Sequence, residues 1–404
     1  MESTIIEKGL GYEFLWQDGS GSGGSIEVQN IKQGSDRLTA LIVFKSYLPG
    51  YKPLLLQRRA NLLSTKAARD LIKEATDACP YLPWREMYEQ MLRCLLERLR
   101  RLPTEIVTPL DMVAEQTYLV DPIVPEGLST IMYGAAGSGK SYLAQFLAIA
   151  VQLGPTDPVA QLRYKHANAI YVDYEASLEE FRRRTKRLCA GMGWPYVELI
   201  YLRGVAPLAE CLMQLKTVVD EHKAKFLVID SLGPAAGGNL NDAETAITFF
   251  EALRKLKCTA FIVAHVPKGP EKERSVFGSS YFTNLARMLW EVKGINEPTA
   301  IKIGLYNRKN NIGRLHRPLA FEITFGEQSA RIEAVDIHKV PDLEEHLSPS
   351  ERILNILRHG SRTIHELSED LDLPETHIKY TLSRLKAKGK VRNVERGRWG
   401  LAPG

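Results

Sequence analysis

Residues 131–147 read IMYGAAGSGKSYLAQFL, and this stretch decides which fold the chain can form. Its centre, GAAGSGKS, matches the pattern G-x-x-x-x-G-K-[ST] between an apolar run and an amphipathic helical pattern. In a loop of this kind, backbone N–H groups surround a phosphate, the lysine reaches the terminal phosphates and the serine ligates Mg²⁺. We therefore predict an ATP and Mg²⁺ site, with a glycine-rich turn as the alternative. Its nucleotide-binding residues are Gly134, Ala135, Ala136, Gly137, Ser138, Gly139, Lys140 and Ser141.

Two later apolar runs end in acids. AIYVDY is followed by Glu175, and FLVI is followed by Asp230. Because the carboxyl ends of parallel strands face the ligand crevice of an α/β sheet, Glu175 is expected to orient the attacking water. Asp230 is expected to hold Mg²⁺ together with Ser141. A solvated helix cap is the alternative for Glu175.

A further run, TAFIVA, leads into His265. Its position, in step with Glu175 and Asp230, suggests a polar group that senses the γ-phosphate. A lone histidine with a structural role is the alternative.

The order of these patterns predicts the domain organisation. Between residues 116 and 335, apolar runs of strand length alternate with helical segments, which predicts an α/β domain with a mostly parallel sheet. Residues 1–115 predict a small α+β domain of unknown role, with a helix over 84–101 whose apolar residues recur every four positions. Residues 336–347 read as a linker to a compact unit over 348–404.

Composition narrows the class of protein. With 44% hydrophobic and 25% charged residues, the chain resembles an ordinary soluble globular protein. Its start lacks a signal pattern and no apolar stretch approaches the ~20 residues of a membrane span, so we predict a cytoplasmic protein without a membrane partner. Five scattered cysteines without a C-x-x-C pair indicate reduced thiols. A net charge of +5 permits a nucleic-acid partner without requiring one.

The last 57 residues, 348–404, predict a winged helix. Capping boxes at Ser348 to Glu351 and at Thr363 to Glu366 each open a helix, and a third helix begins near Pro374. Its core face is expected to hold Ile378, Leu382 and Leu385. A basic hairpin follows as the wing.

The other face of that third helix suits a DNA major groove, because it combines short polar side chains with cations. The wing is expected to contact phosphates. The predicted DNA-binding residues of this unit are Lys379, Tyr380, Ser383, Arg384, Arg392, Arg396 and Arg398. Winged helices also dock proteins, and that alternative stays open.

The ordered motifs resemble those of RecA-fold ATPases over roughly residues 117–335. The motifs are GAAGSGKS, VDYE, FLVIDS, FIVAHVPKG, FGSSYFTNLARMLWEV and IGLYNRKNNIG. They are most similar to RepA-like and DnaB-like hexameric helicases, and the layout also resembles ATPases of phages and mobile replicons. The resemblance implies a homo-oligomer, a hexamer, with single-stranded DNA in a central pore and duplex bound by the winged helix.

The resemblance also assigns further residues. Lys268, Lys272 and Arg274 follow the fourth strand and would grip DNA in the pore, although a solvated surface loop is the alternative. Arg308 would reach into the neighbouring subunit's site as a catalytic arginine. Many relatives have a lysine two residues before that arginine, where this chain has Tyr306, which makes Lys309 a possible substitute.

Together these features favour an ATP-dependent DNA helicase or translocase acting in replication or recombination. The alternative is an ATP-switched DNA-binding protein, such as a recombination mediator or replicon regulator, that does not unwind DNA. Glu175 and Arg308 favour turnover, because a switch needs neither a positioned water nor a cation from a neighbouring subunit. A small-molecule kinase fits poorly with a basic winged helix.

Overall fold

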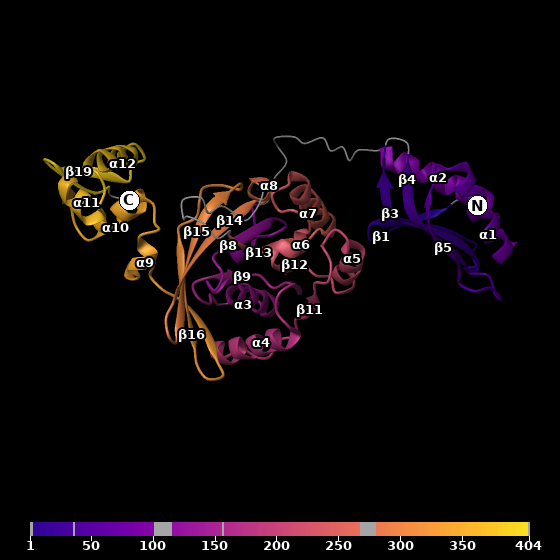
Figure 1. Cartoon of the computed structure of the whole chain (residues 1–404), viewed down its shortest axis with the longest axis horizontal. Coiled ribbons are helices and arrows are strands. Elements are labelled where there is room, and N and C mark those ends of the chain that lie inside the picture. Colours follow the sequence, from indigo (N-terminus) through magenta and orange to yellow (C-terminus); the bar gives the residue numbers. More distant parts are fainter. Residues whose placement is uncertain (1–2, 35–36, 101–114, 156, 267–279, 403–404) are drawn as a thin grey trace. The chain divides into compact units, whose positions relative to one another are not determined.

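The computed structural model describes residues 3–34, 37–100, 115–155, 157–266 and 280–402 (Figure 1). Contacts divide the chain into two units. One comprises residues 1–115 and 210–222, and the other comprises 116–209 and 223–404.

The first unit contains a five-stranded antiparallel sheet in the order β1-β2-β3-β4-β5, followed by two helices. Alternation along β4 buries Ala40, Ile42 and Phe44, which form a core with the buried side chains of the helices. The helix expected over 84–101 is present, and its residues Met87 and Met91 are buried. The elements are β1 (Thr4–Lys8), β2 (Gly11–Gln17), β3 (Gly23–Gln33), β4 (Leu38–Ser46), β5 (Leu54–Asn61), α1 (Thr65–Ala78) and α2 (Trp84–Arg100), and the unit also includes α5 (Leu212–Glu221).

The second unit is built on a nine-stranded sheet in the order β11-β10-β12-β13-β8-β14-β15-β16-β17. Its first six strands are parallel, which confirms the predicted α/β class. They are β8 (Ser129–Gly134), β10 (Ala169–Asp173), β11 (Ile200–Arg203), β12 (Phe226–Asp230), β13 (Thr259–His265) and β14 (Met288–Asn296). Strands β10 and β12 are buried along their whole length, as expected where helices cover both faces of a parallel sheet.

Helices α3 (Lys140–Leu153) and α4 (Leu178–Met192) lie on one side of this sheet, and α6 (Leu232–Ala236) and α7 (Ala243–Leu256) lie on the other (Figure 1). The parallel pairing of β8, β10, β12 and β13 places the carboxyl ends of these strands along one edge of the sheet. The register pairs Asp173 with Asp230, and His265 with Gly134. The polar residues predicted at the strand ends therefore share that edge.

The remaining strands are antiparallel. They are β15 (Ala300–Asn310), β16 (Leu319–Phe325) and β17 (Ala330–Ala334), and the short α8 (Ser280–Leu285) precedes β14. A smaller sheet contains β6 (Tyr118–Asp121), β7 (Val124–Pro125) and β9 (Arg163–Tyr164). The pairing of β14 with β15 shifts register between Leu289 and Trp290, so Arg308 faces no residue of β14.

The predicted linker contains two short helices, η2 (Ile337–Lys339) and α9 (Pro341–Glu344). Leu343 is fully buried in a cluster with Tyr306 and Leu347, and the Tyr306 hydroxyl donates a hydrogen bond to the Leu343 carbonyl oxygen. The segment expected to be only a polar connector is thus packed on β15.

The C-terminal residues form α10 (Pro349–Arg358), β18 (Arg362–Thr363), α11 (Ile364–Leu371), α12 (Glu375–Ala387), β19 (Val391–Glu395) and β20 (Arg398–Leu401). Both predicted capping boxes are present, at the starts of α10 and α11. Ile378, Leu382 and Leu385 of α12 are buried as predicted. The antiparallel sheet has the order β18-β20-β19.

Candidate active site

The GAAGSGKS loop joins β8 to α3 at the carboxyl edge of the sheet. Gly139 takes a left-handed conformation with φ of +80° just before the helix, and a Cβ atom there would lie 2.6 Å from Ile303 Cδ1. At Gly134 a Cβ would lie 2.5 Å from the Val292 carbonyl oxygen. The loop therefore needs glycine at both positions, and it directs the N-terminus of α3 toward the site.

Lys140 is the first residue of α3 and is only 4% exposed. Its Nζ donates hydrogen bonds to the carbonyl oxygens of Gly134 (3.1 Å) and Ala135 (2.6 Å). Burial lowers its pKa to about 8, and the negative charges of Asp230 and Glu175 oppose that shift. A buried ammonium at a helix N-terminus is suited to a polyphosphate, which would restore the preference for the charged form.

Asp230, at the end of β12, is 3% exposed. The Tyr171 hydroxyl donates to its Oδ2 at 2.8 Å, whereas Oδ1 has no hydrogen-bond partner among the described residues. Burial raises its pKa, and hydrogen bonds from the hydroxyls of Tyr171 and Ser141 oppose the shift. A buried carboxylate oxygen without a partner, close to a serine hydroxyl, fits the coordination preference of Mg²⁺.

No group of three or more His, Cys, Asp or Glu side chains that could hold a metal occurs among the described residues. Ser141 and Asp230 would therefore bind Mg²⁺ only together with other oxygens, such as those of nucleotide phosphates and water. When bound, the ion would neutralise charge on those phosphates. Mg²⁺ binding by Ser141 and Asp230 stays a prediction.

Glu175 lies beside Ser141 and Asp230, two residues after the end of β10. Its Oε1 accepts a hydrogen bond from the Ser231 hydroxyl and lies 3.1 Å from His265 Nε2. Bonding to His265 is the largest cause that lowers the pKa of Glu175 to about 2, and the Ser231 hydroxyl and the Lys140 charge add to it while burial opposes it. The structure thus brings the predicted residues Glu175 and His265 together, with Glu175 ionised.

Asp173 is a site residue that the sequence analysis missed. It is 2% exposed, and its Oδ1 accepts hydrogen bonds from the backbone N–H groups of Glu175 (2.9 Å) and Ala176 (2.8 Å). Burial raises its pKa, and these two hydrogen bonds oppose that shift. Asp173 therefore fixes the turn that carries Glu175. The signal was an aspartate two residues before the glutamate, which is the spacing of an Asx turn.

Arg308 lies at the register shift in β15, where an extra residue changes the direction of a side chain. Its Nε and a terminal nitrogen each lie 2.7 Å from Glu291 Oε2, and its guanidinium lies over the Tyr306 ring at 5.1 Å. The side chain is 40% exposed. Arg308 is thus paired with an acid of the same chain. That it reaches into the site of a neighbouring subunit stays a prediction.

The side chain of Lys309, the next residue, bonds to a different part of the chain from that of Arg308. Its Nζ donates hydrogen bonds of 2.8 Å to the carbonyl oxygens of Thr283, Asn284 and Ala286, at the end of α8. Tyr306 is buried against the connector instead of facing solvent. These contacts give Lys309 a structural role and weaken it as a substitute for Arg308.

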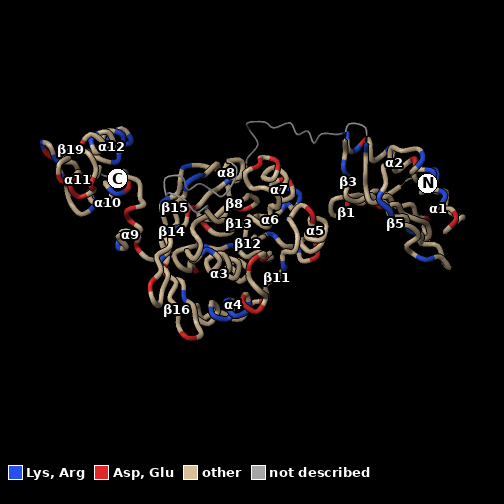
Figure 2. The backbone as a smooth tube through the Cα atoms, viewed as in Figure 1, with Lys and Arg blue, Asp and Glu red and all other residues tan. Residues whose placement is uncertain are grey.

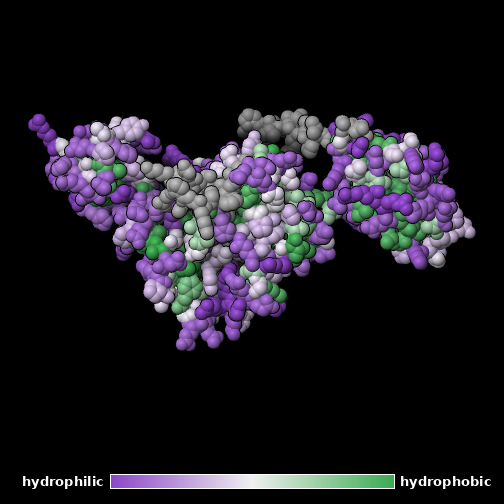
Figure 3. Space-filling view, in the orientation of Figure 1, coloured by the Kyte–Doolittle hydropathy of each residue, from purple (hydrophilic) through white to green (hydrophobic). Residues whose placement is uncertain are grey.

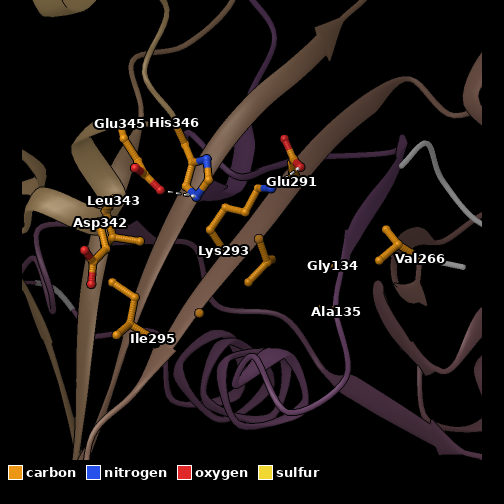
Figure 4. Close-up of a pocket in the computed structure, with 12 residues that line it drawn as sticks. Gly134, Ala135, Val266, Glu291, Lys293, Ile295, Asp342, Leu343, Glu345 and His346 are labelled. Carbon is orange, nitrogen blue, oxygen red and sulfur yellow. Dashed lines mark ion pairs between the residues drawn. The ribbon is translucent and has the colours of Figure 1, made fainter. Parts of the chain in front are cut away.

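A cavity of about 230 Å³ adjoins the start of the phosphate loop (Figure 4). Gly134 and Ala135 line it together with β14 and with α9 of the connector and the residues that follow it. Figure 4 shows Lys293 next to Glu291 on β14, and His346 next to Glu345 in the residues that follow α9. The connector therefore lies next to the nucleotide loop.

The predicted DNA-binding residues of the C-terminal unit differ in exposure. Lys379, Tyr380, Ser383 and Arg384 lie exposed on α12, and Arg392 and Arg396 are exposed on the hairpin. Arg384 lies over the Tyr380 ring at 5.7 Å. Arg398 instead donates to the Ser361 hydroxyl (3.2 Å) and carbonyl oxygen (2.8 Å), so it secures the hairpin. Lys268, Lys272 and Arg274 lie outside the described residues.

Comparisons with known proteins add a family match. Residues 97–271 match the family described as an AAA domain. Together with the phosphate loop at the edge of a mostly parallel sheet, this match supports a nucleotide-dependent ATPase. No curated protein matches the chain.

Two solved structures are similar to part of the chain. A KaiC-like protein from the hyperthermophilic archaeon Pyrococcus horikoshii is 19% identical, with a TM-score of 0.40, over 54% of this chain and 94% of that chain. The flagellar accessory protein FlaH from Methanocaldococcus jannaschii is 16% identical, with a TM-score of 0.37, over 53% of this chain and 91% of that chain. Among the described residues, no helix has the length and apolar character needed to cross a membrane.

Proposed function

We propose that the chain is an ATP-dependent DNA helicase or translocase of the RepA-like type, acting in replication or recombination. The observation that carries the proposal is the arrangement of Glu175, Lys140 and Asp230. An ionised glutamate held by Ser231 and His265 lies beside a buried lysine and a carboxylate oxygen that has no hydrogen-bond partner in the described part of the chain. A site that only bound nucleotide would not need the glutamate, whereas hydrolysis needs a group that orients water.

The mechanism follows from these residues. Lys140 and the N–H groups of the loop bind the phosphates. Ser141 and Asp230 would hold Mg²⁺, which would neutralise charge on those phosphates. Glu175 accepts a hydrogen bond from the attacking water and so orients it toward the γ-phosphate. Asp173 and Ser231 keep the Glu175 carboxylate in place, and His265 links it to the end of β13.

DNA is the proposed partner because of the C-terminal unit, which we propose to be a winged helix. Its exposed α12 face carries cations, a serine and a tyrosine, and its surface is largely hydrophilic (Figure 3). The proposed assembly is a homohexamer with single-stranded DNA in its pore. The alternative is an ATP-switched DNA-binding protein, such as a recombination mediator or replicon regulator.

The test is ATP hydrolysis by the full chain with and without single-stranded or duplex DNA, with the oligomeric mass measured in the same buffer. A motor is expected to hydrolyse ATP faster when DNA is added. Slow hydrolysis that DNA does not change, combined with ATP-dependent DNA binding, would support the switch instead. Hydrolysis that requires a small-molecule acceptor would identify a kinase.

A further inference from the structure

Helix α4 carries five cations in its sequence LEEFRRRTKRLCAGM, and two of them have structural partners. Arg184 pairs with Glu180 at 2.7 Å and lies over the Tyr142 ring at 4.8 Å. Arg187 donates to the carbonyl oxygens of Gly326 (3.1 Å) and Glu327 (2.9 Å). These two cations therefore stabilise the packing around the helix.

The other three, Arg182, Arg183 and Lys186, are exposed and form no ion pair within the described residues. Their spacing places them on one side of the helix, where like charges three and four residues apart repel each other. None of them lies in the last turn of the helix, where the helix dipole would favour a cation. Glu179 lies three and four residues before Arg182 and Arg183 and offsets part of this repulsion. Lys186 has no acid three or four residues away on α4, and an anionic ligand would stabilise all three cations.

Grooves run along both sides of these cations. One, of about 510 Å³, is lined by Arg183, Lys186 and Tyr142 among others. The other, of about 620 Å³, is lined by Arg182, Lys186 and Tyr196 among others. Each groove combines cations with a tyrosine, and its cations outnumber its acids, which are Glu180 and Glu327 in the first and Glu198 in the second. Tyr196 is 73% exposed. Figure 2 shows the blue basic positions along α4, and Figure 3 shows a mostly hydrophilic surface in that part of the unit.

We propose that this basic face of α4 binds single-stranded DNA. Proteins hold a single strand with cations along its phosphates and aromatic rings against its unstacked bases, and both are present here. A duplex hides the faces of its bases, so it would use the cations but not the exposed ring of Tyr196. The proposal rests on the proposed function for the choice of DNA, and it adds a contact surface that is neither the loop after β13 nor the C-terminal unit.

The surface is also connected to the candidate active site. Helix α4 begins three residues after Glu175, with Ser177 as its N-cap. Arg184 lies over the ring of Tyr142, the residue that follows Ser141. DNA bound along α4 would therefore restrict the motion of elements that carry Glu175 and Ser141.

The test is the affinity of the full chain for a fluorescent oligothymidylate, measured by anisotropy at several salt concentrations. Replacing two cations in Arg182→Gln/Lys186→Gln is expected to lower the slope of log affinity against log salt by about 1.4, because each phosphate contact on a single strand contributes ~0.7. Affinity near 0.1 M salt is expected to fall roughly tenfold or more.

The matched control is Arg69→Gln/Lys73→Gln on α1, which removes an exposed arginine and an exposed lysine at the same spacing. It is expected to leave affinity and slope unchanged. Tyr196→Ala is expected to weaken binding of the oligothymidylate without changing the slope, and to leave duplex binding unchanged. Circular dichroism of each variant checks that it is folded.

The possible failures are distinguishable. If the wild-type chain binds the oligothymidylate and the α4 variant keeps its affinity and slope, the α4 surface is wrong and the proposed function stands. If the α4 variant loses duplex and single-strand binding equally and Tyr196→Ala changes neither, the preference for single strands is wrong. If the wild-type chain binds no DNA, the proposed function itself is wrong.

Discussion

The buried ammonium group of Lys140 makes nucleotide binding sensitive to pH. Its pKa of about 8 without phosphate would rise when phosphate oxygens surround it, so binding requires the protonated lysine. We expect ADP affinity to be constant below pH 8 and to fall by up to tenfold per pH unit above it. Titration calorimetry between pH 7 and 9 measures this.

Calorimetry in two buffers of different ionisation enthalpy provides the control, since proton uptake on binding is expected only near and above pH 8. Constant affinity up to pH 9 would mean that Lys140 is fully protonated without ligand, contrary to the effect of its burial.

Glu175 and Lys140 are expected to fail in different ways. Glu175→Gln removes the negative charge and proton-accepting ability but keeps the shape, so ATP should bind while hydrolysis falls by about 10²–10⁴-fold. Lys140→Ala should lose tight ATP binding. Binding by fluorescent nucleotide and turnover by phosphate release separate the two effects.

Ser231→Ala is the milder companion variant, because it removes one hydrogen bond to Glu175 and leaves the His265 contact. A smaller loss of turnover is expected from it. Near-normal turnover in Glu175→Gln would place the water-orienting group elsewhere and remove the main argument against a nucleotide switch.

At the scale of elements, α12 and the hairpin β19–β20 are expected to supply duplex binding. A chain that ends after Leu347 keeps the buried connector residues Leu343 and Leu347 and should retain basal ATP hydrolysis. Its duplex affinity should fall, together with the steepness of the salt dependence, because several cationic contacts that release counterions are lost. Anisotropy with a labelled duplex measures both quantities.

Truncation at this position matters because a cut before α9 would expose Tyr306 and the cavity beside the phosphate loop. A matched point variant, Lys379→Gln/Arg384→Gln, should reproduce part of the loss without removing the unit. Unchanged duplex affinity and slope in the truncated chain would favour a protein-docking role for the C-terminal unit.

At the scale of the whole molecule, the proposed oligomer predicts that two inactive proteins restore each other's activity. Arg308→Ala and Glu175→Gln are each expected to be inactive, and arginine fingers contribute about 10³–10⁵-fold in rate. In a mixture, some interfaces combine an intact Glu175 with an intact Arg308, so hydrolysis should reappear. Phosphate release from mixed oligomers, verified by mass, measures this.

The ion pair of Arg308 with Glu291 adds a control. Glu291→Gln removes the partner that holds Arg308 in its own subunit and should not abolish hydrolysis. An active Arg308→Ala protein, or an inactive mixture of demonstrably mixed oligomers, would show that Arg308 does not act across the interface. Lys309 would be a weak replacement, because carbonyl oxygens at the end of α8 already hold it.

The sequence by itself determined the local features of this protein. The GAAGSGKS loop, the two buried strands that lead to Glu175 and Asp230, the capping boxes and the core face of α12 were predicted. The structure contains each of these features, although β10 ends at Asp173, two residues before Glu175. These features can be predicted from the sequence because each depends on residues close together in the chain. Examples are a turn that needs glycine, an apolar run of strand length and a side chain that caps the next helical turn.

Only the tertiary structure decided which distant residues meet. The contacts of Glu175 with Ser231 and His265 depend on the order and register of β10, β12 and β13. The pairing of Arg308 with Glu291 depends on a register shift between β14 and β15, and the burial of Leu343 depends on β15 lying beneath the connector. These contacts join elements far apart in the chain, so their geometry comes from sheet pairing and packing, which no local pattern encodes.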